Sequence, residues 1–267
     1  MAVDASLQAR LDWALQLAEE AGQLTLDYFL SDRFQVSRKS DSSPVTQADL
    51  LAEKLLRDRI AERFAEDAIV GEELGVKEGT SGFCWILDPI DGTKSFICGV
   101  PLYSQLIGIL RDEESVVGVI SVPGLRETVY AAQGGGAWWK RANHPVVPAR
   151  VSANTNLAEG TFLLSQVDSF AKRGAGEAFL RLQNQAYITR TWGDGYGYLL
   201  VATGRADVMV DPIMNVWDAA AILPVMQEAG GAFTDWQGRP RINSGEGIGA
   251  NRGVLDQVLQ ITRDYTS

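Results

Sequence analysis

Histidine and cysteine are nearly absent from this sequence of 267 residues, which has one histidine, His144, and two cysteines, Cys84 and Cys98. Two cysteines are too few for a disulfide framework, and such a low cysteine content is typical of a protein from a reducing cytoplasm. A single histidine leaves little for a zinc or non-haem iron site, because such sites usually take several nitrogen or sulfur ligands.

Basic residues are in the minority, with 24 Lys and Arg against 34 Asp and Glu, which gives a formal net charge of -10. This balance argues against a general affinity for nucleic acid or for anionic membranes. Long apolar runs are also absent, since none approaches the ~18 residues of a membrane span. The first residues, MAVDASLQARLDWALQLAEEAG, indicate an amphipathic helix rather than a signal peptide. We therefore expect a cytoplasmic protein without nucleic-acid or membrane partners.

The spacing of apolar residues predicts helices and strands that alternate along the chain. The expected helices cover about 6–30, 47–64 (capped by Thr46), 175–185, 196–204 and 217–231. The expected strands cover about 68–70, 83–87, 104–110, 115–122, 128–132, 160–166, 186–192, 207–211 and 232–236. The polar stretch 31–44 between the first two helices is expected to form a loop or hairpin. Such alternation in both halves predicts a layered α/β (α+β) architecture.

The stretch HPVVPARV, residues 144–151, carries two prolines and is the expected boundary between two lobes. The first, residues 1–145, would be an α+β lobe that carries most of the candidate metal ligands. The second, residues 146–267, would be an α/β lobe.

Carboxylates stand at the ends of apolar segments at three places. Glu72 and Glu73 follow AIV, Asp88 and Asp91 follow FCWIL, and Asp218 opens the helix that begins WDAAA. Binding sites in layered α/β proteins gather where strands end and helices begin. Hard oxygen ligands without histidine suit magnesium. The plainer alternatives are turn-forming aspartates at 88 and 91, a solvated Glu73 and a helix-capping Asp218.

The DPIDGT turn adds neutral groups to these carboxylates. Pro89 stiffens the turn, and the Ile90 carbonyl offers another oxygen ligand. Gly92 lets the backbone approach closely, and the amides of Gly92 and Thr93 could open a helix towards an anion, although Thr93 could be only a cap. Two metal ions held in this way suit phosphoryl transfer to water, because one generates hydroxide and both stabilise the charge on the oxygens.

Together, GEE (71–73), DPIDGTKSF (88–96) and WDAAAILPVMQEAGG (217–231) resemble the three signature motifs of the inositol monophosphatase superfamily. PVTQAD (44–49) resembles the upstream threonine–aspartate segment of that superfamily. The resemblance runs from about residue 40 to the C-terminus. It implies a magnesium-dependent, lithium-sensitive phosphatase with an αβαβα sandwich fold, usually a homodimer.

The resemblance also implies roles for individual residues. The ligands of two or three Mg²⁺ ions would be Glu72, Asp88, Asp91, Asp218 and the carbonyl of Ile90. Thr93 and its hydrogen-bond partner Asp49 would orient the attacking water, and Glu72 would act with them in catalysis. The amides of Gly92 and Thr93 would hold the phosphate of a small phosphorylated metabolite, beside Asp91 and Asp218.

The stretch TWGDGYGYLLVATGRADVMVDPIMNVWD, residues 191–218, resembles the histidinol-phosphatase branch of this superfamily. Gly195 and Val216 differ from the cysteine and proline that are expected in that branch. The resemblance implies a substrate pocket around Gly193, Asp194 and Asp211. Two carboxylates there would suit the ammonium and imidazole of histidinol phosphate, and a charged hydrogen bond contributes about 1.5–3 kcal/mol.

The expected function is therefore hydrolysis of L-histidinol phosphate to L-histidinol, a step of histidine biosynthesis. The nearest alternative substrate is inositol 1-phosphate, and nucleotide 3'-phosphates and fructose 1,6-bisphosphate are more distant ones. A different class of function is a regulatory binding protein that keeps the phosphatase fold. The two pocket carboxylates could instead have structural roles and not bind substrate. Asp194 could pair with Arg190 or Arg205, and Asp211 could be a strand-end charge.

Overall fold

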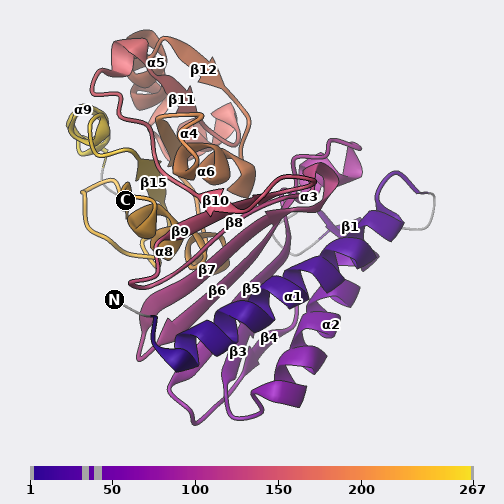
Figure 1. The fold of residues 1–267 in the computed structure, drawn as a ribbon. Coiled ribbons are helices and arrows are strands. Elements are labelled where there is room, and N and C mark those ends of the chain that lie inside the picture. The colour runs from indigo at the N-terminus through magenta and orange to yellow at the C-terminus, as the bar shows by residue number, and fades with distance from the viewer. Residues whose placement is uncertain (1–2, 32–35, 39–43, 266–267) are drawn as a thin grey trace.

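The computed structural model describes residues 3–31, 36–38 and 44–265 of the chain, and these form five stacked layers (Figure 1). Most of the stretch expected as a loop or hairpin, 31–44, lies outside the described residues. Its described parts, β1 (Val36–Arg38) and β2 (Pro44–Thr46), pair as antiparallel strands.

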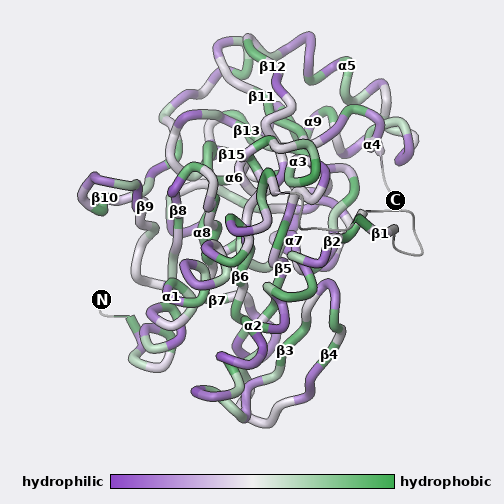
Figure 2. The backbone as a smooth tube through the Cα atoms, turned by 90° about the vertical axis from the view of Figure 1, so that its right-hand side faces the viewer, coloured by the Kyte–Doolittle hydropathy of each residue, from purple (hydrophilic) through white to green (hydrophobic). Residues whose placement is uncertain are grey.

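The first layer consists of α1 (Ala5–Tyr28) and α2 (Gln47–Arg63), which run along one face of the large sheet (Figure 1). Thr46 caps α2 as predicted, because its side chain accepts a hydrogen bond from the amide of Ala48. Short hydrophobic and hydrophilic stretches alternate along both helices (Figure 2), as expected of helices that bury one side.

The second layer is a sheet of eight strands with the spatial order β10-β9-β8-β7-β6-β5-β3-β4. All neighbours are antiparallel except β3 and β5. The strands are β3 (Ala68–Gly71), β4 (Gly75–Lys77), β5 (Phe83–Asp91), β6 (Ser104–Arg111), β7 (Glu114–Val122), β8 (Glu127–Ala132), β9 (Ala137–Arg141) and β10 (Val147–Pro148). A short helix, α3 (Thr93–Ile97), follows β5.

The third layer holds α6 (Gly195–Ala202), α7 (Val216–Ala219) and α8 (Ile222–Glu228), with α6 and α8 in contact with both sheets. The single helix predicted for 217–231 is divided into α7 and α8. Pro224 explains the break, because it has no N–H to donate to the carbonyl of Ala220 four residues earlier. That carbonyl instead accepts a hydrogen bond of 2.5 Å from the hydroxyl of Ser115 on β7.

The last two layers are a sheet of five strands, in the order β12-β11-β13-β15-β14, and the outer helices. The strands are β11 (Thr161–Leu163), β12 (Ile188–Arg190), β13 (Val208–Asp211), β14 (Ala232–Thr234) and β15 (Gly247–Ala250). The outer helices are α4 (Val167–Lys172), α5 (Gly176–Gln185) and α9 (Leu255–Thr262). The αβαβα sandwich is therefore confirmed.

Several short elements were not predicted, and β15 shows why. Its sequence, GIGA, has too few side chains to give a strand pattern. A Cβ at Gly249 would lie 2.6 Å from the ring of Tyr198, and one at Gly247 would lie 2.6 Å from the sulfur of Met214. The glycines are thus required by packing against the middle layer. The same packing supports Tyr198 beneath the pocket described below.

The expected boundary between the lobes falls beside β10, the last strand of the large sheet in the chain. The core between the two sheets combines residues of both proposed lobes, such as Leu106 and Ile120 with Leu199 and Met226. The division into 1–145 and 146–267 therefore stays a proposal about two lobes that share a core. No helix among the described residues is long and apolar enough to cross a membrane.

Two paired glycines bring the middle layer close to the large sheet. Gly108 of β6 lies opposite Gly118 of β7. A Cβ at Gly108 would lie 2.6 Å from the Cβ of Ala220, and one at Gly118 would lie 2.0 Å from the carbonyl oxygen of Ala221. Only glycine leaves room for this segment, which directly follows Asp218.

We predict that Gly118→Ala destabilises the protein by about 2 kcal/mol or more, because the added methyl group must displace backbone rather than a flexible side chain. For a chain of this size the midpoint of thermal unfolding should fall by about 4–8 °C. Gly176→Ala is the matched control, since nothing lies within 4 Å of its Cβ position. Equal unfolding midpoints for the two variants would contradict the close-approach argument.

Candidate active site

Three carboxylates meet where β5 ends and α7 begins. Asp88, Asp91 and Asp218 each offer an oxygen, and these oxygens all lie within 4.8 Å of one another. Residues three apart on a regular strand point to opposite faces. The pairing of β5 with β6 is irregular between Asp88 and Asp91, at the Pro89–Ile90 turn. The irregularity brings both aspartates into the same cluster.

Each carboxylate of the cluster is held from one side by the protein itself. Asp88 accepts the Ile90 amide at 3.1 Å, and Asp218 accepts the Asn215 amide at 2.6 Å. The second bond belongs to a capping box at the start of α7, so the expected helix cap and the cluster carboxylate are the same group. Asp91 accepts hydrogen bonds from the hydroxyl of Ser104 at 2.8 Å and from an amide of α6.

Burial and mutual repulsion make this cluster hard to ionise without a cation. Burial, followed by the charges of neighbouring carboxylates, raises the pKa of Asp88 and Asp91 well above the usual range. Burial, with Glu72 and Asp211 among the further causes, raises the pKa of Asp218 to about 7. Hard oxygen donors with excess negative charge and no histidine fit a divalent cation of the magnesium type.

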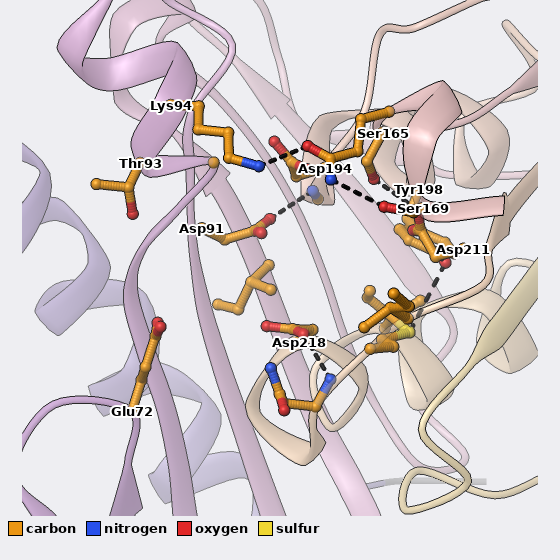
Figure 3. Close-up of a pocket in the computed structure, with 18 of the residues that line it drawn as sticks. Glu72, Asp91, Thr93, Lys94, Ser165, Ser169, Asp194, Tyr198, Asp211 and Asp218 are labelled. Carbon is orange, nitrogen blue, oxygen red and sulfur yellow. Dashed lines mark hydrogen bonds between the residues drawn. The ribbon is translucent and has the colours of Figure 1, made fainter. Parts of the chain in front are cut away.

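Glu72 lies immediately after β3, on the other side of the pocket from Asp218 (Figure 3). It is not one of the three carboxylates whose oxygens converge within 4.8 Å. It still faces them, since its charge contributes to the raised pKa values of Asp88 and Asp218. Glu73, the following residue, does not line the pocket.

Thr93 and Asp49 come together from α3 and α2. The hydroxyl of Thr93 lies 3.4 Å from the Asp49 carboxylate and 3.1 Å from the carbonyl oxygen of Ile90. Asp49 is the third residue of the α2 capping box, where it accepts the Thr46 amide at 2.8 Å. Burial raises the pKa of Asp49, and the charge of Glu72 adds to this effect. Gly92, with a φ of 83°, makes the turn that places Thr93 at the start of α3.

Asp194, just before α6, approaches the carboxylate cluster from the second half of the chain. A Cβ at Gly92 would lie 2.7 Å from an Asp194 carboxylate oxygen, so this carboxylate rests on the DPIDGT turn. The next residue, Gly195, donates its amide to Asp91 at 2.5 Å. A Cβ at Gly195 would lie 2.3 Å from the Ser104 hydroxyl. The glycine that departs from the branch pattern therefore fits a position with no room for a side chain.

The alternative ion pairs for Asp194 are not formed among the described residues. Arg205 instead pairs with Glu127 at 2.6 Å, and Arg190 donates to the carbonyl of Thr189. Gly193, the third residue of this segment, is also tightly packed, because a Cβ there would lie 2.3 Å from the Cα of Ser165.

Asp211 ends β13, lines the pocket and is only 6% exposed. It accepts hydrogen bonds from Ser165 at 2.5 Å and from the hydroxyl of Tyr198 at 2.9 Å. Burial raises the pKa of Asp211 to about 6, and the charge of Asp194 contributes. Because it is buried and accepts two hydrogen bonds, Asp211 differs from a solvated charge at the end of a strand.

A pocket of about 500 Å³ connects these groups (Figure 3). Of the residues predicted for the site, those that line it are Glu72, Asp91, Gly92, Thr93, Asp194, Asp211 and Asp218. Asp49, Asp88, Ile90 and Gly193 do not line it. Asp49 and Ile90 contact Thr93, Asp88 lies in the carboxylate cluster, and Gly193 precedes Asp194. The structure thus gathers the predicted residues around one pocket.

Several other pocket residues were not expected from the sequence. Ser165 and Tyr198 donate hydrogen bonds to Asp211, and Lys94 donates one of 2.5 Å to Gln166, which also lines the pocket. Tyr198 falls in the expected helix 196–204, but no local pattern predicts its contact with Asp211. Nothing local marks Ser165 or Gln166, which reach the site only through the second sheet.

The layered fold and the carboxylate cluster define an enzyme of the metal-dependent type. The chain belongs to the inositol monophosphatase family, whose model matches residues 6–267. It is 42% identical over 249 residues to a histidinol-phosphatase of Chlorobaculum parvum, covering 93% of this chain and 94% of that protein. It is 35% identical over 247 residues to a histidinol-phosphatase of Streptomyces coelicolor, covering 91% and 92%.

Solved structures agree with this assignment. An IMPase of Thermotoga maritima superposes with a TM-score of 0.85 at 30% identity, covering 96% of this chain and 98% of that one.

We predict that magnesium stabilises the protein more at about pH 8 than at about pH 5.5. An unfolded aspartate titrates near pH 3.9, whereas the pKa of Asp218 in the fold is about 7. Between these values the folded state keeps a proton that the unfolded state has released, so metal-free stability falls as pH rises. Magnesium bound to the deprotonated carboxylates would offset that loss at high pH.

At a concentration about 100 times its dissociation constant at pH 8, magnesium should contribute about 2.7 kcal/mol. This is about 5–10 °C in the unfolding midpoint, and less than half of that shift should remain at about pH 5.5. Thermal unfolding with chelator and with magnesium measures the effect, and Asp218→Asn should reduce it at both pH values. An equal magnesium shift at the two pH values in the unsubstituted protein would exclude proton competition at this cluster.

Proposed function

We propose that the protein hydrolyses L-histidinol phosphate to L-histidinol and phosphate, a step of histidine biosynthesis. The observation that carries the proposal is the continuity of the site, in which one pocket joins a carboxylate cluster of the metal-binding type to Asp194 and Asp211. The names of the relatives from Chlorobaculum parvum and Streptomyces coelicolor support the same substrate.

The proposed metal is Mg²⁺, with two or three ions per site. Glu72, Asp88, Asp91, Asp218 and the carbonyl of Ile90 would hold them. When bound, the ions supply charge neutralisation for the phosphate and activation of the attacking water. The all-oxygen donor set and the raised pKa values of the cluster support this assignment.

Thr93 and Asp49 are proposed to orient the attacking water, together with Glu72. The Thr93 hydroxyl lies within 3.4 Å of Asp49, which is held by the α2 capping box and so offers a fixed acceptor. The amides of Gly92 and Thr93, at the start of α3, would receive the phosphate oxygens beside Asp91 and Asp218.

Asp194 and Asp211 are proposed to recognise the cationic end of the substrate, in the pocket segment that begins at Gly193. Asp194 rests on Gly92, next to the proposed phosphate position, which suits an ammonium one carbon away from the phosphate ester. Asp211 is held further along the pocket by Ser165 and Tyr198 and would face the imidazole. Carboxylates that are fixed by their own chain need little reorganisation on binding.

Inositol 1-phosphate is the second candidate substrate. The 30% identity to the Thermotoga maritima IMPase favours it, and carboxylates can also accept hydrogen bonds from ring hydroxyls. For the protein as a whole we propose a cytoplasmic homodimer that acts on a small phosphorylated metabolite, without nucleic-acid or membrane partners. The net charge of -10 supports the last point.

We predict that Thr93→Ala lowers kcat by about 10²–10⁴-fold, the usual contribution of a positioned proton-transfer group. Asp49→Asn should have a similar effect, because it weakens the acceptor of the Thr93 hydroxyl. Steady-state phosphate release measures both variants, and circular dichroism establishes that they fold. Wild-type turnover in Thr93→Ala would assign the orientation of the water to another group.

We predict that the unsubstituted protein, given magnesium, hydrolyses histidinol phosphate in preference to inositol 1-phosphate, fructose 1,6-bisphosphate and a nucleotide 3'-phosphate. Asp194→Asn keeps the side-chain shape and removes the charge. It should therefore lower kcat/KM for histidinol phosphate by about 10-fold or more, which corresponds to about 1.4 kcal/mol.

The control substrate is a small phosphate monoester of an uncharged alcohol, because it would engage the carboxylate cluster and its metal but has no cationic end. Its hydrolysis by Asp194→Asn should change little. Equal losses on both substrates would give Asp194 a structural role. A preference of the unsubstituted protein for inositol 1-phosphate would exclude the proposed substrate and leave a metal-dependent phosphatase.

A further inference from the structure

Glu53 of α2 is a carboxylate outside the pocket whose contacts lead into it. It is completely buried, at 0% exposure, although it lies in a helix whose opposite side faces solvent. Such a group is costly to bury unless its oxygens are fully hydrogen-bonded. The location of its partners therefore indicates what the carboxylate holds in place.

The partners of Glu53 are two successive amides of the turn between β3 and β4, together with one arginine. One carboxylate oxygen accepts the Glu73 amide at 2.7 Å. The other accepts the Leu74 amide at 3.0 Å and the Nε of Arg57 at 2.7 Å. These two amides directly follow Glu72, so the turn that carries Glu72 is tied to α2 through Glu53.

A glycine of the neighbouring backbone makes room for this carboxylate. A Cβ at Gly71 would lie 2.1 Å from a carboxylate oxygen of Glu53, so the glycine before Glu72 makes room for the contact. The glycine of the GEE motif therefore has a packing reason that is independent of the pocket.

The same side of α2 also holds Thr93. Asp49, Glu53 and Arg57 are spaced four apart and so lie along one side of the helix. Asp49 contacts the Thr93 hydroxyl, and Glu53 contacts the turn after Glu72. One rigid helix thus sets the relative positions of Thr93 and Glu72, which face the same pocket in Figure 3.

We propose that Glu53 is a positioning residue that sets the metal affinity of the site by fixing the direction of Glu72. The inference rests on the proposed function, in which Glu72 is a metal ligand. Partners that orient metal ligands typically change metal affinity by about 10–100-fold when they are substituted. The charge of Glu53 is required as well as its shape, because only a carboxylate accepts hydrogen bonds at both ends.

Glu53→Gln tests this requirement. Glutamine has one acceptor and one donor end, so it can serve Leu74 and Arg57, or Glu73, but not both sides. We expect the dissociation constant for Mg²⁺, measured by calorimetry on the purified protein without substrate, to rise by about 10-fold or more. The magnesium concentration for half-maximal activity should rise in parallel, and excess magnesium should restore most of kcat.

Three further variants separate positioning from general loss of structure. Glu72→Gln is the positive control for the metal site. Asp207→Asn is the matched control, because Asp207 is a buried carboxylate that accepts bonds from Ser152, Asn251 and Thr161 away from the pocket. It should lower the unfolding midpoint and leave the magnesium dissociation constant unchanged. If Glu53→Gln does not fold, Glu53→Asp is the substitute. It keeps the charge, shortens the reach to the two amides and should also raise the dissociation constant for Mg²⁺.

The outcomes distinguish the inference from the proposed function. Weakened magnesium binding in Glu53→Gln and Glu72→Gln, with wild-type binding in Asp207→Asn, supports the positioning role. Wild-type affinity in Glu53→Gln beside weakened affinity in Glu72→Gln would overturn the role of Glu53 and leave the metal site standing. Unchanged affinity in Glu72→Gln would overturn the proposed ligand and, with it, this inference.

Discussion

The burial of several like charges in one place is the constraint on which the rest of this structure depends. Asp88, Asp91 and Asp218 meet within 4.8 Å, and burial raises the pKa of all three. Such a cluster disfavours folding unless each carboxylate is hydrogen-bonded and a cation neutralises the group. Much of the surrounding architecture serves the first of these requirements.

The chain satisfies its site carboxylates with helix starts and backbone amides. Asp49 and Asp218 each occupy the third position of a capping box, so the start of a helix orients a site carboxylate. Asp91 takes an amide from α6, and Glu53 takes two amides from the turn after β3. Asp49 and Glu53 are bound to the protein through both oxygens. Asp91 and Asp218, which line the pocket, each accept these bonds through one oxygen.

Glycines also shape the site, because they allow these elements to approach closely enough for the carboxylates to meet their partners. Gly108 and Gly118 admit the segment after Asp218, Gly195 brings α6 against Asp91, and Gly71 admits Glu53. Substitution at such positions meets backbone or site side chains. A defect in packing would therefore also be a defect in the geometry of the pocket.

The sequence by itself determined the class of fold and the carboxylates of the site. Helix and strand periods indicated the layered architecture, and Asp88, Asp91 and Asp218 stood out because they lie where a buried strand ends or a helix begins. It could not reveal the α7–α8 break at Pro224, the glycine-built strand β15, or the partners Ser165, Tyr198 and Glu53. These depend on contacts between segments far apart in the chain, such as Ser165 with Asp211 or Glu53 with the turn after Glu72. Local patterns record which residues are buried, whereas only tertiary structure decides which buried groups meet.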